Sequence, residues 1–278
     1  MPLLVSAATA FPEHRYPQRE ITEAFAALLA GVDDDPEALR RLVGRTHEAT
    51  GVDARHLTLE LDGYEKLADF GEANDVFLRE APPLAARAVT EALGAAGLLA
   101  TDVDLLAAAT VTGIAVPTLD ARIAPLLGMR SNLRRLPLAG LGCVAGAAGV
   151  ARVSDYLRGD PDAVAVLVCV ELCSLTLQGA DASMANIVAS GLFGDGAAAV
   201  VLVGDRRADQ LRGPVGRVVD TASVQFPDSE RVMGWDVGAT GLRVVLAPTV
   251  PDLVRSELRP FVDGFLATHA MTVRDVDH

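Results

Sequence analysis

The sequence predicts an α/β protein whose central sheet is covered by helices on both faces. Short apolar runs alternate along the chain with segments of helical spacing, and 50% of the 278 residues are hydrophobic while only 4% are aromatic. Strands that are apolar throughout are typical of a sheet buried on both faces. A chain of this length and composition can form a substantial core in one or two closely packed domains.

The first third of the chain begins with an apolar strand at 3–9, followed by helices at 18–30 and 36–46. The second helix has clear start signals, because Asp35 is a capping residue and Pro36 occupies the first helical position. Residues 74–96 are predicted to form one or two helices, interrupted near Pro82 and Pro83.

The rest of the chain continues the alternation of strands and helices. We predict strands at 103–111, 133–139, 163–171 and 196–203, and helices at 119–127 and 143–157. A second strand-rich unit is predicted from residue 215, followed by a proline-opened helix at 248–268.

The charge balance argues against several kinds of partner. The net charge is −13, from 24 basic and 37 acidic residues, so the chain as a whole repels nucleic acid and anionic membranes. Lys66 is the only lysine, which argues against Schiff-base chemistry. No run reaches the ~18 to 20 apolar residues of a membrane span, and residues 1–11 lack the basic segment of a signal peptide. The sequence therefore predicts a cytoplasmic protein.

The three cysteines have different surroundings. Cys143 lies between an apolar strand and a helix so rich in Gly and Ala that we expect it to be deeply packed. A helix N-terminus stabilises a thiolate, and Gly140 and Gly142 would let a substrate carbonyl approach the backbone. Cys169 and Cys173 lie on one strand about 13 Å apart, beyond disulfide reach, and three cysteines are too few for a zinc site. Cys143 is therefore the candidate nucleophile.

Three segments carry a resemblance to a known family. Residues 140–146, 168–177 and 185–199, in this order and spacing, resemble the type III polyketide synthases, the chalcone synthase-like branch of the thiolase superfamily. Within that family the chain is similar to bacterial members that make alkylresorcinols or alkylpyrones from fatty acyl-CoA starters. The resemblance implies a homodimer of the layered αβαβα thiolase fold, with no metal or redox cofactor. Residues 1–212 would form the thiolase-like half with the nucleophile, and 213–278 the beginning of the second half.

The resemblance also implies a reaction. Cys143 would take an acyl group from acyl-CoA and hold it while malonyl-CoA is decarboxylated and the resulting carbanion attacks the bound thioester. Such a role suits sulfur, because a thiolate is both a nucleophile and a good leaving group.

The remaining candidate site residues come from the same resemblance. Phe193 would be the gate between the CoA tunnel and the cavity, or an apolar plug before a glycine turn. Cys173 and Thr176 would form the cavity wall, or pack below a strand end. Val244 replaces a second gate phenylalanine, and Trp235 would narrow the cavity or simply pack.

Two more residues are implied outside the cavity wall. Val116 would cross the dimer interface into the partner's cavity. Arg55 would contact a CoA phosphate, with a solvated surface arginine as the alternative.

The family's catalytic machinery includes a His-Pro-Gly-Gly motif and a later asparagine, and neither occurs in these 278 residues. We expect them beyond His278 in a longer protein; His278 itself would be a substitute base only within hydrogen-bond reach of the sulfur. One alternative is a catalytically incomplete acyl-binding module or dimer partner. Another is a β-ketoacyl carrier-protein synthase III-like enzyme, against which residues 171–177 argue. A third is a dinucleotide-binding loop at 140–146 with Glu171, but its glycine spacing is one residue too long.

Overall fold

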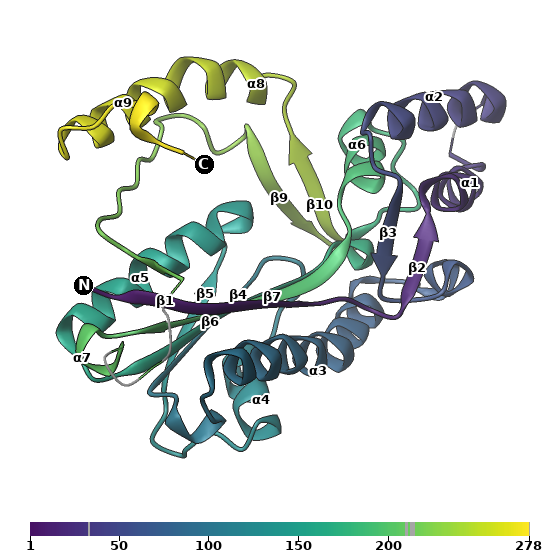
Figure 1. Cartoon of the computed structure of the whole chain (residues 1–278). Helices are drawn as coiled ribbons and strands as arrows, with labels where there is room; N and C mark the ends of the chain where they lie inside the picture. The colour runs from purple at the N-terminus through teal and green to yellow at the C-terminus, as the bar shows by residue number, and fades with distance from the viewer. Residues whose placement is uncertain (33, 209–210, 212–214, 278) are drawn as a thin grey trace.

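A six-stranded mixed sheet forms the centre of the computed structural model, which describes residues 1–32, 34–208, 211 and 215–277 (Figure 1). In spatial order its strands are β5 (Arg134–Ala139), β4 (Leu105–Thr110), β6 (Val164–Leu172), β7 (Asp195–Val203), β1 (Leu3–Ala10) and β8 (Gly216–Arg217). β4, β5 and β6 are parallel, whereas β7 and β1 each run antiparallel to their neighbours. The carboxyl ends of β4, β5 and β6 therefore meet at one edge of the sheet.

Helices cover both faces of this sheet. α3 (Phe70–Ala96) and α4 (Leu119–Leu126) lie on one face, and α5 (Ala145–Gly159) lies on the other (Figure 1). β4 and β6 are buried along most of their length, as their continuous apolar sequences predict. The predicted α/β class is confirmed.

α3 is one continuous helix through Pro82 and Pro83, where the sequence allowed an interruption. Its buried side, which includes Phe77 and Val89, packs against β1, β6 and β7. This burial offsets the hydrogen bonds that two prolines remove from a helix interior.

α5 begins two residues later than predicted, after a 3₁₀ turn, η3 (Gly142–Val144). The expectation of deep packing holds on one side only. Gly149 and Val153 are buried toward the sheet, but Gly146 and Ala147 are exposed, so the expectation is wrong for that face. Among the described residues, the sheet covers α5 from one side.

A peripheral layer flanks one end of the sheet. β2 (His14–Pro17) pairs with β3 (Ala54–Leu57), while α1 (Gln18–Leu28), α2 (Pro36–Ala49) and α6 (Met184–Leu192) pack together. Phe25, Leu29, Val43 and Ile187 form their common core. As predicted, the Asp35 side chain caps α2, accepting a hydrogen bond from the Ala38 N–H at 2.9 Å.

The last part of the described chain carries a hairpin and a helix. β9 (Met233–Gly238) and β10 (Gly241–Leu246) lie beside α6 (Figure 1). The helix predicted at 248–268 is observed as α8 (Val250–Leu253), a π-helical turn, η5 (Val254–Leu258), and α9 (Arg259–Ala267). The π turn ends two residues before Pro260, which lacks a backbone donor. The predicted domain boundary at 212/213 lies outside the described residues.

The remaining helical turns are short. They are η1 (Leu61–Lys66), η2 (Ala100–Asp102), η4 (Cys173–Thr176), α7 (Asp205–Ala208) and η6 (Val273–Asp275). No helix in the described part of the chain has both the length and the apolarity needed to cross a membrane.

Candidate active site

Cys143 lies in the turn η3, between the carboxyl end of β5 and the start of α5. Gly140, two residues before this turn, and Gly142, its first residue, have φ angles of +76° and +57°. This left-handed backbone favours glycine, so both glycines are needed for the turn itself. The Cys143 side chain is exposed at the sheet edge where β4, β5 and β6 end.

The other two cysteines are poor nucleophiles. In β6, burial and then the charge of Glu171 raise the pKa of Cys169 to about 11. Burial, followed by the charges of Asp195, Glu171 and Cys143, raises the pKa of Cys173 even further. Thiols with raised pKa values stay protonated at neutral pH and react slowly. Among the three cysteines, the exposed Cys143 is the one that a thioester can reach.

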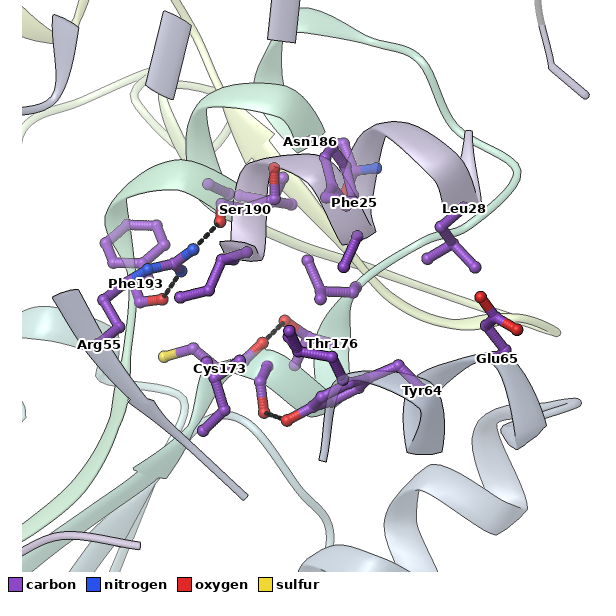
Figure 2. A pocket seen from close by; sticks show the side chains of 18 of the residues that line it. Phe25, Leu28, Arg55, Tyr64, Glu65, Cys173, Thr176, Asn186, Ser190 and Phe193 are labelled. Atoms are coloured by element: carbon purple, nitrogen blue, oxygen red, sulfur yellow. Dashed lines mark hydrogen bonds between the residues drawn. The ribbon is translucent and has the colours of Figure 1, made fainter. Parts of the chain in front are cut away.

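A small cavity, here called the inner cavity, is lined by six of the residues singled out from the sequence (Figure 2). These are Arg55, Cys173, Thr176, Phe193, Trp235 and Val244. Cys143 and Val116 are not among its lining residues. Its volume is about 50 Å³, room for about four water-sized groups.

The hairpin supplies one side of the inner cavity. Trp235 on β9 and Val244 on β10 are direct cross-strand partners, so both side chains lie on the same face of the hairpin. The large indole therefore stands beside the small valine, and both face the elements that carry Cys173 and Phe193.

The buried side chain of Arg55 links separate segments of the cavity wall by hydrogen bonds. Its Nε donates to Gln18 Oε1 at 3.0 Å, and its terminal nitrogens donate to the carbonyls of Phe193 and Ser190 (Figure 2). The residue is only 7% exposed, and burial lowers the pKa of its guanidinium. The surface-arginine alternative is wrong, and this geometry gives no support to a contact with a CoA phosphate.

Phe193, the candidate gate, follows α6 directly, and hydrogen bonds of its backbone groups fix its position. Its N–H donates to the Ala189 carbonyl at 3.1 Å, and its own carbonyl accepts from Arg55. Its half-buried ring lines the inner cavity. The gate role itself stays a prediction.

Asp195 organises a network that sequence reasoning missed. At the start of β7 and only 4% exposed, it accepts hydrogen bonds from the Thr58 N–H (2.7 Å), the Thr58 hydroxyl (2.6 Å), the Ser174 N–H (2.8 Å) and the Ser174 hydroxyl. Burial raises the pKa of the Asp195 carboxyl. The network joins the end of β3 to η4, the turn that carries Cys173 and Thr176. The sequence did contain a sign of this buried carboxylate: an acidic residue stands between Gly194 and Gly196, at the start of an apolar strand.

Glu171 organises the neighbouring strand end in a similar way. It accepts hydrogen bonds from the N–H groups of Val111 (3.0 Å) and Thr112 (3.1 Å) and from the hydroxyls of Thr110 (3.2 Å) and Thr112 (2.6 Å). Burial raises the pKa of this carboxyl. Its oxygens thus bind the loop after β4, which disagrees with the role of a ribose ligand in a dinucleotide site.

Val116 lies farther along that loop and is 85% exposed. The nearby Ile114 is also 50% exposed. The side chain is available to a second subunit, and its place at a dimer interface stays a prediction.

His47 is buried beside the cavity wall and should make stability depend on pH. It contacts Thr22 Oγ1 (2.9 Å) through Nδ1 and Ser190 Oγ (3.1 Å) through Nε2, and it is 1% exposed. Burial, and then the charge of Arg55, lower its pKa from 6.5 to about 4. The unfolded chain therefore binds the proton first, and the free energy of unfolding falls as the pH drops from 6.5 toward 4.

We expect this effect to be about 2 kcal/mol between pH 7 and pH 5. Urea unfolding of the wild type and His47→Gln at both pH values measures the effect. The buried carboxylates of Glu171 and Asp195 are present in both proteins, so their contribution cancels in the comparison. His14→Gln, on β2, is the control and should behave like the wild type. The same pH dependence in His47→Gln and the wild type would contradict the assignment.

Metal ligands are not gathered anywhere in the described ranges: no group of three or more His, Cys, Asp or Glu side chains could hold a metal ion. His278, the candidate substitute base, lies outside the described residues.

Comparison with known proteins identifies the family. Residues 2–206 match the family model for chalcone and stilbene synthases, N-terminal domain. The chain is 48% identical over 270 residues to 1,3,6,8-tetrahydroxynaphthalene synthase of Streptomyces peucetius subsp. caesius, covering 96% of this chain and 70% of that protein. It is 31% identical to phloroglucinol synthase of Pseudomonas fluorescens, covering 88% of this chain and 67% of that protein.

A solved structure supports the same assignment. The type III polyketide synthase 1,3,6,8-tetrahydroxynaphthalene synthase of Streptomyces coelicolor A3(2) superposes with a TM-score of 0.87 at 32% identity, covering 99% of this chain and 76% of that chain. The predicted thiolase-like fold is thereby confirmed. Together with the three motifs and the exposed cysteine in the first of them, these matches establish that the chain belongs to the chalcone and stilbene synthase family, as a type III polyketide synthase.

Proposed function

We propose that this chain forms polyketides by loading an acyl group from a CoA thioester onto Cys143 and extending it with malonyl-CoA. One observation carries the proposal: Cys143 is the exposed cysteine at the edge where three parallel strands end, inside the first family motif. Cys169 and Cys173, with their raised pKa values, are unsuited to the same role.

The chemistry has two steps at one sulfur. The Cys143 thiolate attacks the thioester carbonyl carbon, a new sulfur–carbon bond forms, and the CoA thiolate leaves. Malonyl-CoA then loses CO₂, and the resulting carbanion attacks the Cys143 thioester. The carbon–carbon bond forms as Cys143 leaves as a thiolate, ready for the next acyl group. This scheme consumes CoA thioesters and needs no electron carrier.

Two kinds of starter are candidates. The resemblance favours a fatty acyl starter and alkylresorcinol- or alkylpyrone-type products. The inner cavity of about 50 Å³ favours a short starter instead, because about four water-sized groups fill it. The name of the 48%-identical relative, a tetrahydroxynaphthalene synthase, also describes a product without an alkyl chain.

The assembly and location are part of the proposal. We infer a homodimer, supported by the exposure of Val116 and Ile114 on the loop that Glu171 anchors. A cytoplasmic location agrees with the supply of CoA thioesters.

Product analysis tests the function. The protein is incubated with acyl-CoAs of graded length and isotope-labelled malonyl-CoA, and both the intact protein and the released products are analysed by mass spectrometry. An acyl adduct on Cys143 and labelled products support the proposal. Absence of any adduct with every acyl-CoA would contradict it.

The cavity wall provides a more local prediction. Cys173→Phe and Thr176→Phe should each shorten the longest accepted starter or product, because both side chains line the inner cavity. Thr90→Phe, on the exposed side of α3, is the control and should leave the product profile unchanged. Unchanged profiles in both wall variants would show that Cys173 and Thr176 only contribute packing.

A further inference from the structure

The carbonyls at the end of α6 are bound by two side chains from other elements. The last carbonyls of a helix have no partner within the helix, so other groups must satisfy them. Here the Ser190 carbonyl accepts from a terminal nitrogen of Arg55, and the Gly191 carbonyl accepts from Gln18 Nε2 at 2.8 Å. Arg55 also donates to the carbonyl of Phe193, the residue after the helix.

Gln18 and Arg55 act as one unit, here called the α6 clamp. Gln18 Oε1 accepts from Arg55 Nε at 3.0 Å, and the two residues are only 8% and 7% exposed. The oxygens that Arg55 binds are an amide oxygen and two backbone carbonyls. A cation is stabilised at the negative end of a helix, so the guanidinium suits this place. The clamp connects the start of α1 and the strand β3 to the end of α6.

The connection between α6 and β7 consists of Phe193 and Gly194 and is fixed on both sides. On one side Arg55 binds the Phe193 carbonyl, and Figure 2 shows its guanidinium between Ser190 and Phe193. On the other side Asp195 is fixed by the hydrogen bonds that its carboxylate accepts at the end of β3 and at η4. The backbone held in this way decides where the Phe193 ring stands in the lining of the inner cavity.

The inner cavity is within electrostatic reach of the nucleophile, although Cys143 does not line it. After burial and the charges of Asp195 and Glu171, the charge of Cys143 also raises the pKa of Cys173, which lines the cavity together with Phe193. Misplacing a group by about 1 Å can lower a reaction rate by about 10²-fold. The position of the Phe193 ring therefore bears on acyl transfer to Cys143.

α6 is also held by contacts that do not involve the clamp. Ile187 lies in the core that α6 shares with α1 and α2. Ser190 Oγ lies 3.1 Å from His47 Nε2, and a Cβ at Gly191 would lie 2.5 Å from His47 Cδ2, so the two helices already touch there. Removing the clamp should therefore leave α6 in place and displace mainly the turn that carries Phe193.

We propose that Arg55, oriented by Gln18, is a positioning residue for acyl loading, which holds the backbone of Phe193 so that its ring keeps one place beside the inner cavity. Arg55 acts on the reaction through this ring and touches no reacting atom. The inference rests on the proposed function, since it concerns the transfer of an acyl group from a CoA thioester to Cys143.

A double-mutant cycle between Arg55 and Phe193 tests the inference. Arg55→Met, Phe193→Ala, the double variant and the wild type each receive the acyl-CoA that loads the wild type fastest. The mass of the intact protein, followed from seconds to hours, gives the rate of adduct formation on Cys143. Arg55→Met should lower this rate by about tenfold in the wild-type background, through the misplaced ring. In the Phe193→Ala background the same replacement should change the rate by less than about twofold, because the two residues act as a unit.

Arg55→Lys distinguishes the geometry of the clamp from its charge. Lysine keeps the positive charge, but its donors lie on a single nitrogen and cannot reach Gln18 and both carbonyls, so we expect a loss of at least about threefold. Arg87→Met is the matched control, because the exposed Arg87 also donates to a backbone carbonyl, that of Phe11, outside the inner cavity. It should load like the wild type.

The outcomes separate the inference from the proposed function. An unchanged rate in Arg55→Met, an equal loss in both backgrounds, or a full rate in Arg55→Lys would overturn the positioning role. Absence of a Cys143 adduct in the wild type would instead refute the proposed function. Cooperative thermal unfolding shows that each variant is folded, and the cycle is run with Arg55→Lys if the methionine variant does not fold. A merely structural role of Arg55 would lower the loading rate equally with and without the Phe193 ring.

Discussion

Replacing Cys143 by alanine should abolish acyl transfer, with a loss of turnover on the order of 10⁶-fold, the scale observed when a covalent nucleophile is removed. The reason is that no sulfur–carbon bond can form, while Cys169 and Cys173 are held as thiols by their raised pKa values. The measurement is the mass of the acylated protein together with product formation. Cys169→Ala is the matched control, which should retain the adduct.

Alkylation checks the same assignment without turnover. Iodoacetamide at neutral pH should label Cys143 first, because it is exposed and the other two cysteines are partly or largely covered. Peptide mass spectrometry after short exposures gives the order of labelling. Equal labelling of all three cysteines, or retained activity in Cys143→Ala, would remove the nucleophile assignment.

Asp195→Asn should lower the free energy of unfolding by about 2 to 4 kcal/mol, because buried donors would lose their charged acceptor. Thr58 and Ser174 each direct an N–H and a hydroxyl at the Asp195 carboxylate. An asparagine has a single acceptor oxygen, and its amide would face donors. Urea unfolding at pH 7 measures the difference.

Asp62→Asn is the control for this prediction. Asp62 pairs with Lys66 at 3.3 Å, but its side chain is 69% exposed, so the change should cost less than about 1 kcal/mol. Equal losses in the two variants would show that the Asp195 network adds no special stability. A loss of unfolding free energy confined to Asp195→Asn would show that the Asp195 network stabilises the wall around Cys173 and Thr176.

The strands and the candidate nucleophile were within reach of the sequence. β4 and β6 are buried on both faces, so their residues form continuous apolar runs that stand out without any structural information. Cys143 follows the edge strand β5, directly after two glycines, Gly140 and Gly142, that adopt positive φ angles. These features depend only on residues that are close together in the chain, so they can be recognised from the sequence alone.

Contacts between distant segments were not visible in the same way. β2 and β3 have only four residues each and pair with one another across more than one helix, so no local period marks them. Arg55 looked like a surface or phosphate-binding arginine, yet its partners Ser190 and Phe193 are more than 130 positions away in the chain. Likewise, α3 continues through Pro82 and Pro83 because the sheet beneath it supplies packing that local propensity does not include.

The sequence by itself determined the α/β class and the family, and it singled out Cys143 as the candidate nucleophile, because apolar period, glycine placement and motif spacing are local properties of the chain. Only the tertiary structure decided the shape of the site. It brought Arg55, Cys173, Phe193 and Trp235 around one small cavity, and it directed the Arg55 guanidinium to the carbonyls at the end of α6. Cavity walls form where segments far apart in sequence pack together, and the volume left between side chains depends on all of them at once.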